Sequence, residues 1–345
     1  MLVKIYFYIK YELNKILQRL KILTKMSSDY EIIALLSAIL KYFHQIGGPI
    51  LMIIGSVSCI LNLCVFGRKS LRKNPCTIYL IATNINGLLL IYTSTLYMTL
   101  AFGYSIDPTA YNVVFCRFRF YTMFLFEILS PCYLILASID RVLITSQSAL
   151  TRRKSTNRLA YVSITIVTIF WSIVHCHSFI FMNLVSFAPG FSACFFQPAS
   201  YLLVMSYYPL VVKVFLIPCL MITFGLYTVR NIRKVNKTAP TLLIHSATTA
   251  NGNSRIVRSK DQQLIKILLM DITVYIVFNL IQSVIVIYQQ IGQNQPHTIL
   301  QSQIGGFIFI LALTCSPIPF YIGCYTNLIV SKTFRQEMKN ILMLR

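Results

Sequence analysis

Three ionisable residues, Glu127, Lys213 and Asp271, lie inside long apolar stretches of the sequence. A charge is costly in apolar surroundings, and a protein that keeps one there generally uses it. An acid and a base in such a place can neutralise each other, bind the charged group of a ligand, or line a path for ions. The sequence shows no cluster of His, Cys and acids, no nucleophile motif and no glycine loop for phosphate, so we do not expect an enzyme.

The composition is that of a membrane protein. Hydrophobic residues make up 56% of the 345 residues, charged residues make up 12%, and the mean hydropathy is +0.68. The formal net charge of +22 comes from basic residues between apolar stretches, which favours contact with anionic lipid or a protein partner over nucleic acid. The ten cysteines form neither CxxC pairs nor zinc-ligand spacing, so no metal or cofactor is expected.

Seven apolar stretches are long enough to carry these residues across a membrane. A bilayer core is about 30 Å thick, and a helix needs roughly 20 residues to cross it. The stretches cover residues 47–66, 76–101, 113–143, 159–183, 203–228, 264–288 and 299–325. We therefore expect an all-α membrane protein: an N-terminal segment at 1–45, a seven-helix bundle at 46–329, and a short amphipathic eighth helix with a tail at 330–345.

Basic residues in alternate loops predict the orientation of the bundle, because Lys and Arg are held on the cytoplasmic side. The first, third and fifth loops carry Arg68, Lys69, Arg72, Lys73, Arg152, Arg153, Lys154, Arg158, Arg230, Arg233, Lys234, Lys237, Arg255, Arg258 and Lys260. The loops on the other side hold almost no charge. We expect a multi-pass protein of the plasma membrane, with its N-terminus outside and its C-terminal tail inside.

Residues 1–25 do not fit this orientation, because this segment is expected outside and yet carries six Lys and Arg and a single acid, Glu12. The segment has too many interspersed charges for a signal peptide and no cleavage site of small residues. Three explanations remain open: the functional chain starts at Met26, the segment lies as an amphipathic helix on the membrane surface, or it is a tail without function.

The third stretch ends in an adjacent acid and arginine, Asp140 and Arg141, and Cys116 lies 24 residues before Asp140. Cys194 falls in a long uncharged loop on the same side of the membrane as Cys116. With these residues the sequence resembles the rhodopsin-like, or class A, G-protein-coupled receptors, and divergent invertebrate peptide-type receptors more closely than opsins. The resemblance implies a disulfide between the two cysteines and an acid-arginine switch that engages a heterotrimeric G protein.

Further positions extend the resemblance over most of the chain. Structural residues of the family correspond to Asn62, Trp171, Pro218, Pro317 and Phe334, the last of these at the start of the amphipathic eighth helix. The resemblance also assigns Asp261 to a pairing with Arg141 in the inactive state, although Asp261 could instead be a solvated charge beside Lys260.

Several departures from the family pattern put parts of its mechanism in doubt. The sixth stretch reads Phe278-Asn279-Leu280-Ile281 where an aromatic and a proline are usual, and Asn84 and Asn86 stand where a sodium-binding Asp is usual. The register of Ser316-Pro317 against the family's Asn-Pro motif is uncertain, and Val142 replaces a Tyr. Sodium regulation and the usual movement of the sixth helix are therefore open.

The ligand is expected in the outer half of the bundle, where the candidate contacts are Glu127, Met123, Lys213, Arg119, Arg117 and Asn279. Met123 stands where aminergic receptors place an Asp, and no Lys occurs in 299–329 to bind retinal, so a peptide fits best. Internal pairing of Glu127 with Lys213 is the plainer alternative to ligand contact. The competing functions are an ion channel or transporter and a receptor relic that no longer signals.

Two further expectations concern buried polar residues. Asp271 could join Asn62 or Tyr321 in a polar network. His175 and His177 are two residues apart, about 200° around a helix, so they are not expected to share a metal ion.

Overall fold

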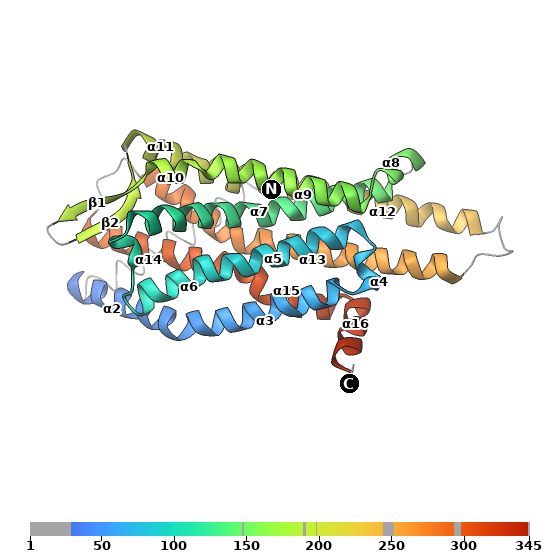
Figure 1. Cartoon of the computed structure of the whole chain (residues 1–345), viewed down its shortest axis with the longest axis horizontal. Coiled ribbons are helices and arrows are strands. Elements are labelled where there is room, and N and C mark those ends of the chain that lie inside the picture. The colour runs from blue at the N-terminus through green and yellow to red at the C-terminus, as the bar shows by residue number, and fades with distance from the viewer. Residues whose placement is uncertain are drawn as a thin grey trace.

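The computed structural model describes residues 29–146, 148–188, 191–197, 199–243, 252–292 and 298–343. Seven helical segments in this part of the chain are long and apolar enough to cross a membrane: Asp29–Phe66, Pro75–Gly103, Val113–Thr145, Asn157–Phe181, Pro209–Asn231, Gln262–Gln289 and Ile299–Val330. They run alongside one another along the long axis of the molecule (Figure 1). The predicted all-α bundle is confirmed, and the chain is a multi-pass membrane protein. Residues 1–25, with Met26, lie outside the described part.

Most of the seven segments are built from more than one helical element. The first segment is built from α2 (Asp29–Tyr42), η1 (Phe43–Gly47) and α3 (Gly48–Phe66), and the second from α5 (Pro75–Leu90), η2 (Ile91–Thr95), α6 (Leu96–Met98) and η3 (Thr99–Gly103). The third is α7 (Val113–Thr145), the fourth α9 (Asn157–His175) with α10 (His177–Phe181), and the fifth α11 (Ala199–Tyr208), η5 (Pro209–Leu216) and α12 (Ile217–Leu243). The sixth is α13 (Gly252–Gly292), and the seventh α14 (Ile299–Cys315) with α15 (Ile318–Val330).

Polar caps fix where several helices begin. The side chain of Asn112 accepts hydrogen bonds from the backbone N–H groups of Val114 and Phe115 at the start of α7. Thr156 caps α9 in the same way, and Thr298 forms a capping box with Gln301 at the start of α14. Each cap satisfies backbone donors that have no partner inside the helix, so the helix begins at the boundary between a polar loop and an apolar run.

The third helix, α7, lies inside the bundle and packs against α5, α9, α12 and α13. Small residues allow other helices to approach closely. A Cβ atom at Gly87 of α5 would lie 2.8 Å from Cδ1 of Phe320 in α15, and one at Gly103 would lie 2.9 Å from the backbone nitrogen of Gln45. These contacts bring the first, second and seventh segments together around one core.

Several boundaries differ from the prediction; the fifth helix runs on to Leu243 and the sixth begins already at Gly252. The first helical segment starts at Asp29 rather than near residue 47, because α2 and η1 lead into α3 without a break and α2 is itself apolar between Glu31 and Lys41. The fourth helix ends at Phe181, and the chain then forms the hairpin β1 (Met182–Ala188) and β2 (Phe191–Phe196). Its strands pair antiparallel with Leu184 opposite Cys194. The seventh helix, predicted to be continuous, is interrupted at Ser316 and Pro317, where proline removes a backbone donor.

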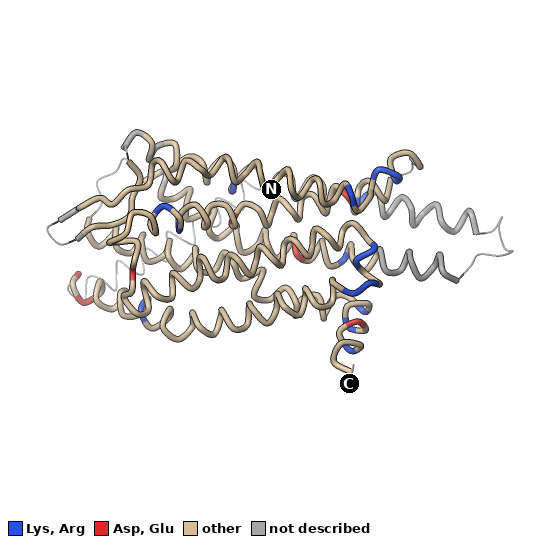
Figure 2. The backbone as a smooth tube through the Cα atoms, viewed as in Figure 1, with Lys and Arg blue, Asp and Glu red and all other residues tan. Residues whose placement is uncertain are grey.

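The two ends of the bundle differ in charge. Lys and Arg gather at the end where the short helices α4 (Lys69–Arg72) and α8 (Ala149–Arg153) lie, together with α16 (Lys332–Leu342); we name it the basic end (Figure 2). The opposite end holds β1 and β2, and we name it the hairpin end (Figure 1). The predicted amphipathic eighth helix is α16, whose Phe334 and Met338 are buried while Arg335 and Lys339 are exposed.

Candidate functional site

The hairpin is fastened to the beginning of α7. Cys116 and Cys194 form a disulfide, with their Cα atoms 5.8 Å apart, as the resemblance implied. At the next residue of the same helix, the Arg117 side chain donates from Nε to the carbonyl of Met182 (2.9 Å) and from Nη2 to Oδ1 of Asn183 (2.7 Å). The disulfide holds β2 and the arginine holds β1, so both strands have a fixed position at the hairpin end.

An ion pair joins two of the intramembrane charges. Nζ of Lys213 lies 2.5 Å from Oε2 of Glu127, and Nε2 of Gln282 lies 3.5 Å from Oε1 of the same carboxylate. These three residues come from η5, α7 and α13. The internal pairing that sequence reasoning offered as the plainer alternative is therefore present, and it connects the third, fifth and sixth helices.

Lys213 stands in η5, a π-helical stretch of the fifth segment. A π turn is wider than an α turn, carries a cost in packing, and is frequently found at functional sites. Pro218 follows as the second residue of α12. The proline lacks a backbone N–H, so it fits the first turn of the α-helix that takes over from the π stretch.

Aromatic rings and two histidines lie on the hairpin side of the ion pair. His175 is stacked between Trp171 and Phe124, with ring centroids 5.6 Å and 5.9 Å away, and its Nε2 lies 3.3 Å from the hydroxyl of Tyr208. The rings of His175 and His177 are 5.7 Å apart. The two rings come close although an unbroken helix would separate them by about 200°, because α9 ends at His175 and α10 begins at His177.

The described residues nevertheless contain no group of three or more His, Cys, Asp or Glu side chains placed to hold a metal ion. A pair of imidazoles offers too few ligands for a closed zinc site, which takes four. The aromatic rings and the two histidines therefore form a wall of the bundle interior and not a metal site.

The remaining ligand candidates do not gather around Glu127. Arg119 is buried, and its guanidinium carbon lies 3.6 Å from the ring centroid of Tyr97 in α6. Met123 is half-buried on α7. Oδ1 of Asn279 accepts a hydrogen bond from Ser316 at 3.1 Å, which ties α13 to the turn between α14 and α15. Arg119 thus faces the second segment, whereas Glu127 faces the fifth.

At the basic end, the predicted switch residues form a buried cluster. The Arg141 side chain is 0% exposed, and its Nη2 donates to Oδ2 of Asp140 at 2.7 Å and to Oδ1 of Asn74 at 2.5 Å. Ser155 donates to the other carboxylate oxygen of Asp140. The side chain of Asp261 lies outside the described residues, so its predicted pairing with Arg141 stays a prediction.

Sequence reasoning missed Asn74. Its Oδ1 also accepts from the backbone N–H of Cys76 at 3.1 Å, so one atom caps α5 and binds the arginine. An Asn directly before a Pro that opens a helix was a visible sign of the cap. Nothing in the sequence indicated that the cap faces the end of α7.

A second polar network lies in the core between α3, α5 and α15. Nδ2 of Asn62 donates to Oδ1 of Asn84 at 2.9 Å, and Nδ2 of Asn327 donates to Oδ1 of Asn62 at 3.2 Å. Asn62 is thus a structural residue as expected, while Asn327 was missed. The suggested link from Asp271 to Asn62 or Tyr321 is not what the structure shows, because the Tyr321 hydroxyl bonds Thr95 instead.

No protein-family model matches the chain, and no curated protein is similar to it. Its function must therefore be argued from the geometry of the bundle.

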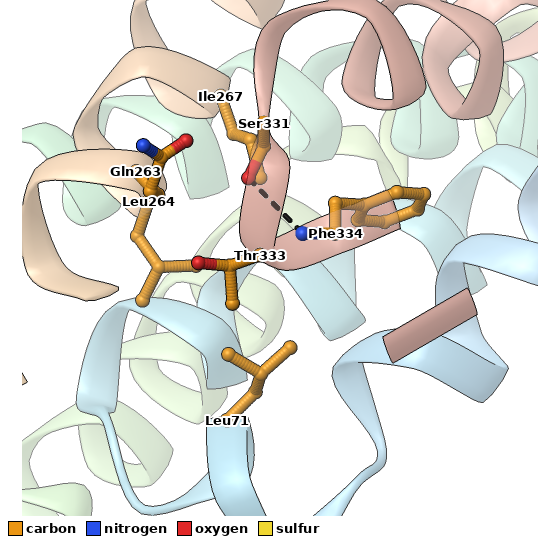
Figure 3. A pocket seen from close by; sticks show the side chains of 7 residues that line it. All are labelled: Leu71, Gln263, Leu264, Ile267, Ser331, Thr333 and Phe334. Atoms are coloured by element: carbon orange, nitrogen blue, oxygen red, sulfur yellow. Dashed lines mark hydrogen bonds between the residues drawn. The ribbon is translucent and has the colours of Figure 1, made fainter. Parts of the chain in front are cut away.

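The basic end also carries a shallow recess lined by Leu71, Gln263, Leu264, Ile267, Ser331, Thr333 and Phe334 (Figure 3). Ser331 caps α16 by accepting from the backbone N–H of Phe334 at 3.2 Å, and Gln263 of α13 accepts from the backbone N–H of Lys332 at 3.2 Å. Phe334 in turn packs against Phe66 of α3, with ring centroids 5.6 Å apart. The sixth helix, α4 and α16 therefore meet at one place.

Proposed function

We propose that the protein is a G-protein-coupled receptor of the rhodopsin-like type. The observation that carries this proposal is the cluster of Arg141, Asp140 and Asn74 at the basic end. A guanidinium that is 0% exposed must be compensated, and here it is compensated by groups on its own helix and at the start of α5. Such a cluster has a second state in which the arginine is released, and a two-state element of this kind is what a receptor needs.

The rest of the architecture supports the same proposal. The basic end, with its Lys and Arg, would face the cytoplasm and the anionic lipid of the plasma membrane, which leaves the N-terminus and the hairpin outside. A disulfide is stable on that outer, oxidising side. An extracellular ligand, a peptide by preference, enters at the hairpin end, and a heterotrimeric G protein binds at the basic end.

The mechanism is a shift between two arrangements and needs no covalent chemistry. In the resting state Arg141 is held by Asp140 and Asn74, with Asp261 as a further restraint. A ligand that binds the active arrangement more tightly draws the population toward it, by as much as its difference in affinity allows. Release of Arg141 opens the basic end, where α13, α4 and α16 meet, for the G protein.

The test is G-protein dissociation in cells that express the full chain or the chain from Met26, with and without a peptide library. Arg141→Ala is expected to abolish the response and Asp261→Ala to raise the basal level. Ile166→Ala, which removes an exposed side chain in the middle of α9, away from the basic end, is the control and should leave signalling unchanged. Equal signalling by the Arg141 and Ile166 variants at matched surface expression would remove the switch from the mechanism.

A channel or transporter is the second candidate, and the intramembrane charges Glu127 and Lys213 favour it. Direct pairing at 2.5 Å neutralises both charges in the described state, so conduction would require the pair to open. An ion current that persists in the Arg141→Ala variant would support this candidate. A chain that reaches the surface and neither conducts nor signals with any ligand would be a receptor relic.

A further inference from the structure

The Glu127–Lys213 ion pair lies deep in the bundle rather than at its mouth. Glu127 follows Cys116 by 11 residues on α7, a distance of about 16 Å along the helix axis. The pair therefore stands near the middle of the bilayer, where a single charge without a partner is costly. Its two side chains hold the third helix to the fifth, and Gln282 extends the contact to the sixth.

The pair is not sealed. The Lys213 side chain is 17% exposed and that of Glu127 is 12% exposed, whereas Arg141 at the basic end is 0% exposed. Part of each side chain is therefore accessible, unlike that of Arg141. Nearby rings of Phe124, His175 and Tyr208 provide an apolar wall for the rest of a small molecule.

The charge balance restricts what can separate the pair. A neutral ligand would leave both charges without compensation, and a ligand with one charge would leave the other uncompensated in a medium of low dielectric constant. A ligand with an ammonium and a carboxylate group compensates both at once, because its ammonium pairs with Glu127 and its carboxylate with Lys213. With a zwitterion, two new ion pairs replace the one between Glu127 and Lys213, so neither charge is left without a partner.

We propose that the ligand of this site is a zwitterion that inserts between Lys213 and Glu127 and pairs with both. In the resting state the two side chains pair with each other instead. Separation of the two side chains frees η5 and Gln282 on α13 from α7, so binding is coupled to movement of the fifth and sixth helices. The coupling to signalling rests on the proposed receptor function, but the binding does not. Free α-amino acids and short peptides share the required chemistry.

Binding is measured on the purified full chain in lipid nanodiscs, as a shift in the temperature of unfolding. The probes are an equimolar pool of the twenty free amino acids and a pool of dipeptides. Two further pools carry one charge each: N-acetylated amino acids keep the carboxylate, and amino acid amides keep the ammonium. A zwitterion pool at ten times its Kd is expected to raise the unfolding temperature by about 2–4 °C, and the single-charge pools are expected to have no effect. The pool that acts, amino acid or dipeptide, identifies the source.

Variants of Glu127 and Lys213 test whether the shift in unfolding temperature arises at this ion pair. Glu127→Gln and Lys213→Met should each lose the shift, whereas Lys266→Met, an exposed lysine of the membrane segment in α13, should keep it. Single neutralisation leaves a buried charge and can prevent folding, so the exchanged double variant Glu127→Lys/Lys213→Glu is measured beside it. That variant retains one acid and one base, and it should fold and still respond to the zwitterion pool.

The outcomes separate the site from the receptor function. An equal shift with either single-charge pool, or no shift with any pool, overturns the zwitterion site. Arg141-dependent signalling without a shift overturns the site and leaves the receptor function standing. A shift that depends on Glu127 and Lys213, in a chain without Arg141-dependent signalling, supports the site and counts against the receptor function.

Discussion

Asn74→Ala is the most informative perturbation, because one oxygen atom has two roles. Oδ1 of Asn74 caps α5 through the N–H of Cys76 at 3.1 Å and binds the Arg141 guanidinium at 2.5 Å. Loss of an Asn cap costs about 1 kcal/mol, and loss of a hydrogen bond to a charged group costs about 1.5–3 kcal/mol. The variant is therefore expected to lower the free energy of unfolding by about 2.5–4 kcal/mol.

A second asparagine provides the matched control. Asn112 caps α7 through two backbone N–H groups, and neither of these bonds involves an arginine. Asn112→Ala should therefore cost the cap alone, about 1 kcal/mol. At about 2 °C per kcal/mol for a protein of this size, the unfolding temperature should fall by about 5–8 °C in the Asn74 variant and by about 2 °C in the control.

The assay is thermal unfolding of each variant in the same lipid nanodiscs. Equal losses in the two variants would refute the reasoning, because the bond between Asn74 and Arg141 would then contribute nothing to the folded state. If the protein is a receptor, Asn74→Ala should in addition raise basal G-protein signalling while Asn112→Ala does not.

Three other perturbations follow from described contacts. Cys116→Ser opens a disulfide between residues 78 apart in sequence, which should cost about 4.5 kcal/mol by loop entropy and sharply reduce surface expression measured by antibody labelling. Asn327→Leu removes a donor to buried Asn62 and should cost about 1–3 kcal/mol in thermal unfolding; no change would show that the network is dispensable. Gly103→Ala would push a Cβ atom into the backbone of the first helix and should cost about 1–3 kcal/mol, whereas Gly306→Ala, with no atom within 4 Å, should be neutral in the same assay.

The sequence by itself determined the architecture. Apolar runs of membrane length set the seven segments, and the charged loops between them set the basic end, because both properties belong to short stretches of chain. The amphipathic α16 could also be predicted from residue type and position, and the disulfide from the family resemblance around Cys116 and Cys194. Helix ends were less accurate, because Pro317 and the hairpin after Phe181 act through local backbone geometry that hydropathy does not record.

Only the tertiary structure decided which polar groups meet. Sequence reasoning named Arg141 and Glu127 but could not find Asn74, which lies 67 residues before Arg141, or choose between a ligand and Lys213 as the partner of Glu127. Those contacts depend on how each helix is rotated about its axis and on how deep it lies beside its neighbours. Rotation and depth are set by close packing of the whole bundle, such as the approach at Gly87, and no single stretch of sequence contains them.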